Sequence, residues 1–164
     1  MLIRDAVAAD IEAVTEIYNS VLRTSTAIYN DTPVTIEDRL SYWQDRISKG
    51  YPLLIAAAKE TGEVLGYATF GDFRSWPGYR FTVEGTIHIH EGVRGKGIGT
   101  QLLHALLDRA RALGKHSMIA AIDSENTASL RFFRHHGFVE CGLLPEVGFK
   151  FGRFLDLCLL QLKL

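Results

Sequence analysis

A glycine-rich turn, Arg94-Gly95-Lys96-Gly97-Ile98-Gly99, separates an alternating apolar segment from an amphipathic pattern typical of a helix. Its three glycines allow the backbone to adopt positive φ and to approach a ligand closely. Successive N–H groups can then point into one concavity at the N-terminus of a helix, where the helix dipole favours an anion. Arg94 and Lys96 add positive charge. The turn therefore predicts a pyrophosphate site between a strand and a helix.

The spacing of these glycines excludes two common phosphate-binding motifs. A Walker A loop needs glycine five residues before its Gly-Lys pair and serine or threonine directly after it, whereas this chain has His90 and Gly97 there. A dinucleotide-binding fingerprint needs Gly-x-Gly-x-x-Gly in a repeated βαβ pattern, and here Gly95, Gly97 and Gly99 are evenly spaced, with no such repeat. Neither a P-loop protein nor a Rossmann dehydrogenase fits.

Hydrophobic periodicity and turn residues predict elements in the order β, α, α, β, β, β, α, β, α, β, β. Asp10 is the expected N-cap of the first helix, and Thr35 with Asp38 is the expected capping box of the second. The second helix should bury a stripe formed by Ile36, Leu40, Trp43 and Ile47. The expected strands are 2–7, 53–58, 64–70, 81–90, 118–122, 139–144 and 154–162, and the expected helices begin near residues 10, 35, 98 and 126.

The strand expected over 81–90 has two chemically different faces. One face carries Phe81, Val83, Ile87 and Ile89, and the other carries Thr82, Glu84, Thr86, His88 and His90. Two histidines and a carboxylate on one face also permit a metal site, but a further ligand at definite spacing is absent. We therefore expect no metal.

The pattern Arg-x-x-Gly-x-Gly between a strand and a helix resembles the acetyl-CoA signature of the Gcn5-related N-acetyltransferase superfamily. The resemblance covers the whole chain, since the order of elements agrees and the segment 126–138 resembles the second coenzyme-facing helix of that family. It implies one domain over residues 1–164, of the α/β (α+β) class, with a mixed, mostly antiparallel sheet of about seven strands and about four helices. It also implies acetyl-CoA as co-substrate.

Two further segments, 79–84 and 146–153, resemble the phosphinothricin and methionine sulfoximine acetyltransferases. These relatives acetylate the α-amine of glutamate-like or methionine-like compounds by direct attack on acetyl-CoA. The resemblance implies that Glu84 is the general base, either directly or through water. Its other implied site residues are Tyr29, Arg74, Tyr79 and Arg80 for the acceptor, and Ile87, His88, Ile89, Arg94, Gly95, Lys96, Gly97, Ile98, Gly99, Thr100, Asn126 and Ser129 for the coenzyme.

This chain departs from the superfamily at two positions. Many members carry a tyrosine, which can protonate the departing thiolate, where this chain has Phe133. The relatives often carry histidine where this chain has Phe151, which leaves the acceptor open. A protein amine as acceptor, or an acyl-CoA-binding module without turnover, are the alternative functions.

The charge balance and the N-terminus bear on partners and location. With 18 basic and 19 acidic residues, no broad field would attract nucleic acid. The first ten residues carry charges among short apolar stretches, unlike a signal peptide or a membrane span. We expect a cytoplasmic protein with no nucleic-acid or membrane partner, and the resemblance implies a homodimer.

Overall fold

The computed structural model describes residues 1–164, and its helices and strands follow the predicted order. The helices are α1 (Ile11–Thr24), α2 (Ile36–Ser48), α3 (Ile98–Ala112) and α4 (Thr127–His135). The strands are β1 (Leu2–Asp5), β2 (Leu53–Ala57), β3 (Val64–Asp72), β4 (Thr82–Ile89), β5 (Ser117–Asp123), β6 (Val139–Lys150) and β7 (Arg153–Lys163). All seven belong to one sheet in the order β1-β2-β3-β4-β5-β7-β6, and β4–β5 is its parallel pair. The predicted mixed, mostly antiparallel α/β fold is confirmed.

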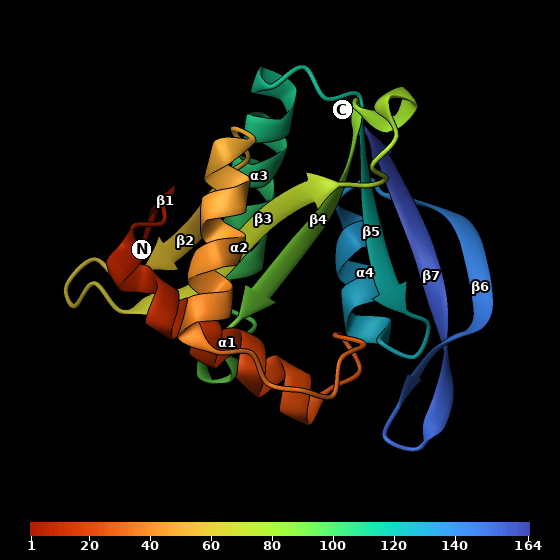
Figure 1. Cartoon of the computed structure of the whole chain (residues 1–164), viewed down its shortest axis with the longest axis horizontal. Coiled ribbons are helices and arrows are strands. Elements are labelled where there is room, and N and C mark those ends of the chain that lie inside the picture. The colour runs from red at the N-terminus through yellow and green to blue at the C-terminus, as the bar shows by residue number, and fades with distance from the viewer.

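Helices cover both faces of this sheet (Figure 1). α3 and α4 pack on one face in a core of 19 buried residues, and α1 packs on the other in a core of eight, with partly buried side chains of α2 at its edge. β2 is buried along its whole length because its side chains alternate between the two cores, Leu54 facing α3 and Ile55 facing α1. The central strands are therefore held from both sides.

β4 and β5 separate soon after they begin. Their pairing covers only Thr82–Glu84 on β4 and Ser117–Ile119 on β5, and beyond it the two strands diverge (Figure 1). β4 remains paired with β3 up to Ile89. Because alternate backbone groups of a strand point to opposite edges, β4 keeps unpaired N–H and C=O groups along the edge that β5 leaves.

The local predictions at α1 and α2 are partly confirmed. Asp10 is the N-cap residue of α1 as predicted, but its side chain does not cap the helix, because the carboxylate pairs with Arg4 at 2.7 and 2.9 Å and accepts the Val7 N–H, inside a 3₁₀ turn over Ala8–Asp10. In α2 the capping box of Thr35 and Asp38 is confirmed. However, Ile36 and Ile47 are exposed, and Arg39, the one buried residue of α2, faces inward instead.

The last two strands form a long hairpin whose tip reaches back to α1. β6 runs to Lys150, six residues beyond the predicted end, with a register shift between Leu144 and Gly148. The turn Phe151-Gly152 has positive φ at both residues (50° and 75°), the requirement of a type I′ hairpin turn. No helix of the structure combines the length and apolarity that a bilayer crossing demands.

Beside this turn, Lys150 is buried and donates three hydrogen bonds to backbone carbonyls of Leu22, Ser25 and Ile28 at 2.6–2.8 Å. These carbonyls belong to the end of α1 and to the segment that follows it. One ammonium group thus ties the hairpin to the residues 25–35 that connect α1 and α2.

Candidate active site

A cavity of about 1040 Å³ opens where β4 and β5 diverge. Its walls come from residues 84–89 of β4, residues 120–123 of β5, the inner faces of α1 and α2, the segment 24–28 and the first turns of α4. Half of its 32 lining residues are hydrophobic. An opening of this kind, with apolar walls and a few polar groups, is typical of a small-molecule site.

Glu84 lies at the point where the strands part and lines the cavity. The residue is half-buried on β4, and none of the hydrogen bonds of the structure involves its carboxylate. Burial raises the pKa of Glu84 above its ordinary value, and the positive charge of Arg74 partly opposes that shift. A half-buried carboxylate with a raised pKa suits a general base better than an ordinary one.

The glycine-rich turn leads directly into α3. Gly95 and Gly97 have φ of 78° and 76°, and Gly97 is the residue before the first turn of the helix. No side chain caps this helix, so its first N–H groups stay available to a ligand. The positive φ expected in this turn is present at two of its three glycines.

The structure divides the predicted coenzyme residues into two groups. Ile87, His88, Ile89, Arg94, Gly99, Asn126 and Ser129 line the cavity. The lining does not include the other five, namely Gly95, Lys96, Gly97, Ile98 and Thr100. Ile98 is 5% exposed and packs in the core under α3, so its role is to anchor the first turn of this helix.

At the other wall, the cavity is lined by Asn126, directly before α4, and by Phe133, in the last turn of that helix. Asn126 is the N-cap, and its Oδ1 accepts the Ser129 N–H at 3.1 Å. Because Oδ1 is engaged in this cap, the Nδ2 amide is the group left to donate to a ligand. Phe133 lines the cavity where the superfamily often has tyrosine, so no hydroxyl is present at that place.

The four predicted acceptor residues do not line this cavity. Tyr29 packs against Gly148 of the hairpin and donates its hydroxyl to the Asp156 carbonyl at 3.2 Å, and burial raises its pKa to about 12. Arg74, Tyr79 and Arg80 are exposed between β3 and β4, where Arg74 stacks on Phe73. Arg74 is still near enough to act on the charge of Glu84.

A group of aromatic side chains inside the cavity was missed by the sequence analysis. Tyr18, Tyr42 and Tyr67 line it together with Arg39, and His88 lies between the rings of Tyr18 and Tyr67. Burial lowers the pKa of His88 to about 4, so this imidazole is neutral at pH 7. Arg39, Tyr42, Trp43 and Arg46 recur at helical spacing, which indicates a face of α2 that carries aromatic and cationic side chains. A pattern made of apolar residues alone does not include them.

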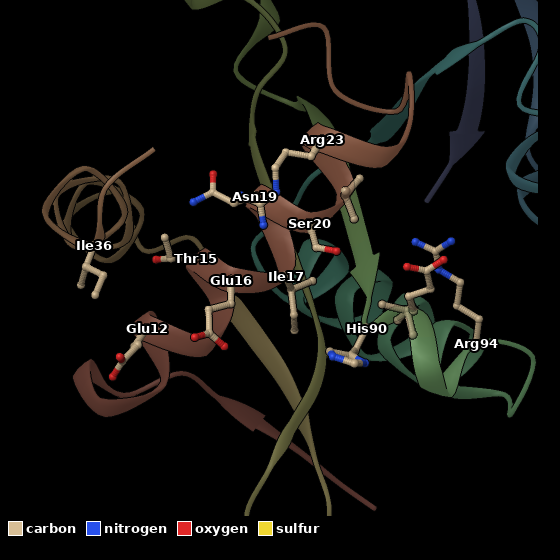
Figure 2. A pocket seen from close by; sticks show the side chains of 13 residues that line it. Glu12, Thr15, Glu16, Ile17, Asn19, Ser20, Arg23, Ile36, His90 and Arg94 are labelled. Carbon is tan, nitrogen blue, oxygen red and sulfur yellow. The ribbon is translucent and has the colours of Figure 1, made fainter. Parts of the chain in front are cut away.

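A second depression, of about 460 Å³, lies on the outer side of α1. Figure 2 shows Glu12, Glu16 and Ser20 of α1 on one side of it, and His90 and Arg94 of the turn after β4 on the other. The ring of His90 accepts the Gly92 N–H at 3.3 Å and thereby caps a 3₁₀ turn. His88 and His90 thus line different hollows, and no group of three metal-ligating side chains gathers anywhere in the structure.

Comparison with known proteins agrees with this geometry. Residues 14–138 match the model of the acetyltransferase (GNAT) family. An L-methionine sulfoximine/L-methionine sulfone acetyltransferase from Pseudomonas aeruginosa is 49% identical over 162 residues, covering 99% of this chain and 94% of the relative.

Two solved structures have nearly the same fold. A phosphinothricin acetyltransferase from Sinorhizobium meliloti in complex with acetyl-CoA superposes with a TM-score of 0.95 at 40% identity, over 99% of this chain and 88% of that one. A ribosomal-protein-alanine N-acetyltransferase from Brucella melitensis gives 0.97 at 41% identity, over all of both chains.

Proposed function

The chain belongs to the acetyltransferase (GNAT) family, and we propose that it transfers an acetyl group from acetyl-CoA to the α-amine of a small amino acid of the methionine sulfone, methionine sulfoximine or phosphinothricin type. The observation that carries the proposal is Glu84, a half-buried carboxylate with a raised pKa at the mouth of the gap between β4 and β5. Acyl transfer to an amine needs a proton acceptor at the point where the coenzyme's thioester would lie.

The coenzyme would occupy the gap in the sheet. The turn 94–99 supplies N–H groups and positive charge for the diphosphate, and the free edge of β4 offers its backbone groups to the pantetheine arm. Asn126 offers an amide donor on the opposite wall. N–H groups of the β4 edge would also stabilise the negative charge that the thioester oxygen gains during attack.

Glu84 would remove one proton from the ammonium group of the acceptor, directly or through a water molecule. The α-amine of an amino acid is less basic than the side-chain amine of lysine, so its deprotonation at pH 7 costs less free energy and one carboxylate can assist it. The free amine attacks the thioester carbon, the C–S bond breaks, and the nitrogen gives up its second proton to the departing sulfur or to water. With phenylalanine at position 133, the sulfur leaves as a thiolate or takes a proton from water, which is feasible because a thiol pKa lies near 8.5.

Two other functions remain as outcomes of the test. The similarity to the ribosomal-protein-alanine N-acetyltransferase favours a protein N-terminus as acceptor. The walls of the cavity favour a small molecule, because α1, α2 and the segment 24–28 cover the β4 gap from one side. An acyl-CoA-binding module without turnover would have no use for Glu84.

The test is a free-thiol assay with acetyl-CoA and a panel of acceptors. We expect thiol release with methionine sulfone, methionine sulfoximine or phosphinothricin, and none with a peptide that carries an N-terminal alanine. A calorimetric titration with coenzyme A should show binding without any acceptor. Binding without thiol release from any amine would identify the binding module, and release with the peptide alone would identify a protein acetyltransferase.

We also propose a homodimer built on the β6–β7 hairpin, and a cytoplasmic location, where acetyl-CoA is available. Large apolar side chains of this hairpin are 40–69% exposed, namely Val139, Leu143, Leu144, Val147, Phe149, Phe151 and Phe154. So large an apolar surface usually marks a protein contact. Light scattering at micromolar concentration should give twice the mass of one chain, and the mass of a single chain would contradict the dimer.

A further inference from the structure

Arg39 is a buried cation without a counter-ion. Its residue is 8% exposed, it lines the cavity, and the Nε atom is fully covered yet has no hydrogen-bond partner. No hydrogen bond or ion pair of the structure involves its guanidinium group. The neighbouring carboxylate of Asp38 is bonded to the backbone N–H and hydroxyl of Thr35. Burying an unpaired charge is costly, so such a group usually has an anionic partner.

Two aromatic rings lie close to the guanidinium group of Arg39. Its guanidinium carbon lies 3.5 Å from the centre of the Tyr18 ring and 5.0 Å from that of Tyr42. Both rings attract the guanidinium through its flat faces. The N–H groups point outward in the plane of the guanidinium, and this edge is where a carboxylate binds with two parallel hydrogen bonds.

Arg39 and Glu84 line the same cavity from different places along β4. Tyr67 of β3 pairs with His88 of β4, and Gly71 of β3 pairs with Glu84 of β4. All four residues belong to the face of the sheet that is turned toward α1 and α2. Arg39 lies at the His88 end, because its guanidinium group stacks on Tyr18, whose ring centre is 6.3 Å from that of His88. Four residues of strand separate the two ends by about 13 Å between Cα atoms. Arg39 and Glu84 both line the cavity of about 1040 Å³, which has room for an amino acid.

We propose that Arg39 binds the α-carboxylate of the acceptor amino acid and so selects amino acids over other amines. This inference rests on the proposed function, because it names a group of the same acceptor. With the carboxylate held at Arg39, the α-amine, one carbon away, faces Glu84 and the gap between the strands. Arg74 lies outside the cavity and compensates the charge of Glu84, so its task differs from that of Arg39.

The experiment compares methionine sulfone with its α-carboxamide, which keeps the amine and the side chain but lacks the negative charge. The wild-type protein should prefer the acid in kcat/KM by about tenfold to a hundredfold, the range of a charge-assisted bidentate pair. Arg39→Met should remove this preference by raising KM for the acid alone. Arg39→Lys keeps the charge but cannot form two parallel hydrogen bonds, so it should retain part of the preference for the acid. This variant also tests the proposal if Arg39→Met fails to fold.

Arg46→Met is the matched control. Arg46 is on the same helix, stacks on Tyr42 at 4.4 Å and has a covered Nε without a partner, but it does not line the cavity. This variant should keep the wild-type preference for the acid even if it loses stability.

Three results would overturn the assignment of Arg39. Equal losses on acid and carboxamide in the Arg39 variants would make its role structural. An unchanged preference with a raised KM for acetyl-CoA would assign Arg39 to the coenzyme. A wild-type protein that acetylates both acceptors equally would show that no carboxylate is recognised, while the acetyltransferase function itself would stand. Absence of turnover with either acceptor would instead contradict the proposed function.

Discussion

Replacing Glu84 by glutamine should lower kcat for an amino-acid acceptor at least tenfold, and by about 10²–10⁴-fold if the carboxylate acts fully as general base. Glutamine keeps the size and the polarity of the side chain but cannot accept the proton of the ammonium group. The KM for acetyl-CoA should stay near the wild-type value, since the turn at residues 94–99 is untouched. Steady-state kinetics with saturating acetyl-CoA measure the change.

The pH profile separates a base from a merely polar group at this position. The pKa of Glu84 is raised by burial, so kcat/KM should fall as the pH drops through a value above the ordinary carboxylate range. Arg74→Ala removes the cation that opposes this shift and should move the fall to still higher pH. Glu84→Gln should lack the Glu84-dependent fall.

Glu91→Gln, which changes an exposed carboxylate just after the same strand, serves as the control and should behave as wild type. Wild-type turnover in Glu84→Gln would remove Glu84 from the mechanism.

Replacing Lys150 by methionine should lower the free energy of unfolding by about 3 kcal/mol. The ammonium group donates three buried hydrogen bonds, and methionine would leave the carbonyls of Leu22, Ser25 and Ile28 without this donor. Hydrogen bonds to a charged group contribute about 1.5–3 kcal/mol each, but three from one group do not add fully, and burial of the charge offsets part of the gain. Burial lowers the pKa of Lys150, in accord with that cost.

Thermal unfolding measures this loss, and a chain of this size should lose about 6–12 °C in Tm. The segment 24–28 lines the cavity, so KM for the acceptor should rise as well. Lys59→Met, at an exposed lysine between β2 and β3, should leave Tm within about 2 °C of wild type. A Tm for Lys150→Met as high as that of Lys59→Met would show that the three contacts contribute little.

The order and the class of the elements could be predicted because their local signals agree with the global fold. The capping box at Thr35, the glycines of the turn at 94–99 and the alternation around Glu84 all depend on neighbours in sequence. The position of Glu84 at the cavity followed from that alternation together with the family resemblance. Gly97 shows the same agreement, since its positive φ begins the helix that follows.

What escaped prediction depends on contacts between distant segments. α2 was expected to bury Ile36 and Ile47, but it turns Arg39 inward because Tyr18 of α1 supplies a ring on which the guanidinium stacks. The hairpin extends past Leu144 because Lys150 finds its partners at the end of α1, more than a hundred residues earlier. No short window of sequence contains either pair of partners.

The brief pairing of β4 with β5 also bears on how the molecule moves. Only three residue pairs join β1–β4 to β5–β7 within the sheet, and the remaining edge of β4 stays open. A coenzyme lying along that edge would bridge the two halves as an extra strand does. Within the sheet, acetyl-CoA would then be part of the architecture as well as a reactant, while the core under α3 and α4 holds the two halves together without it.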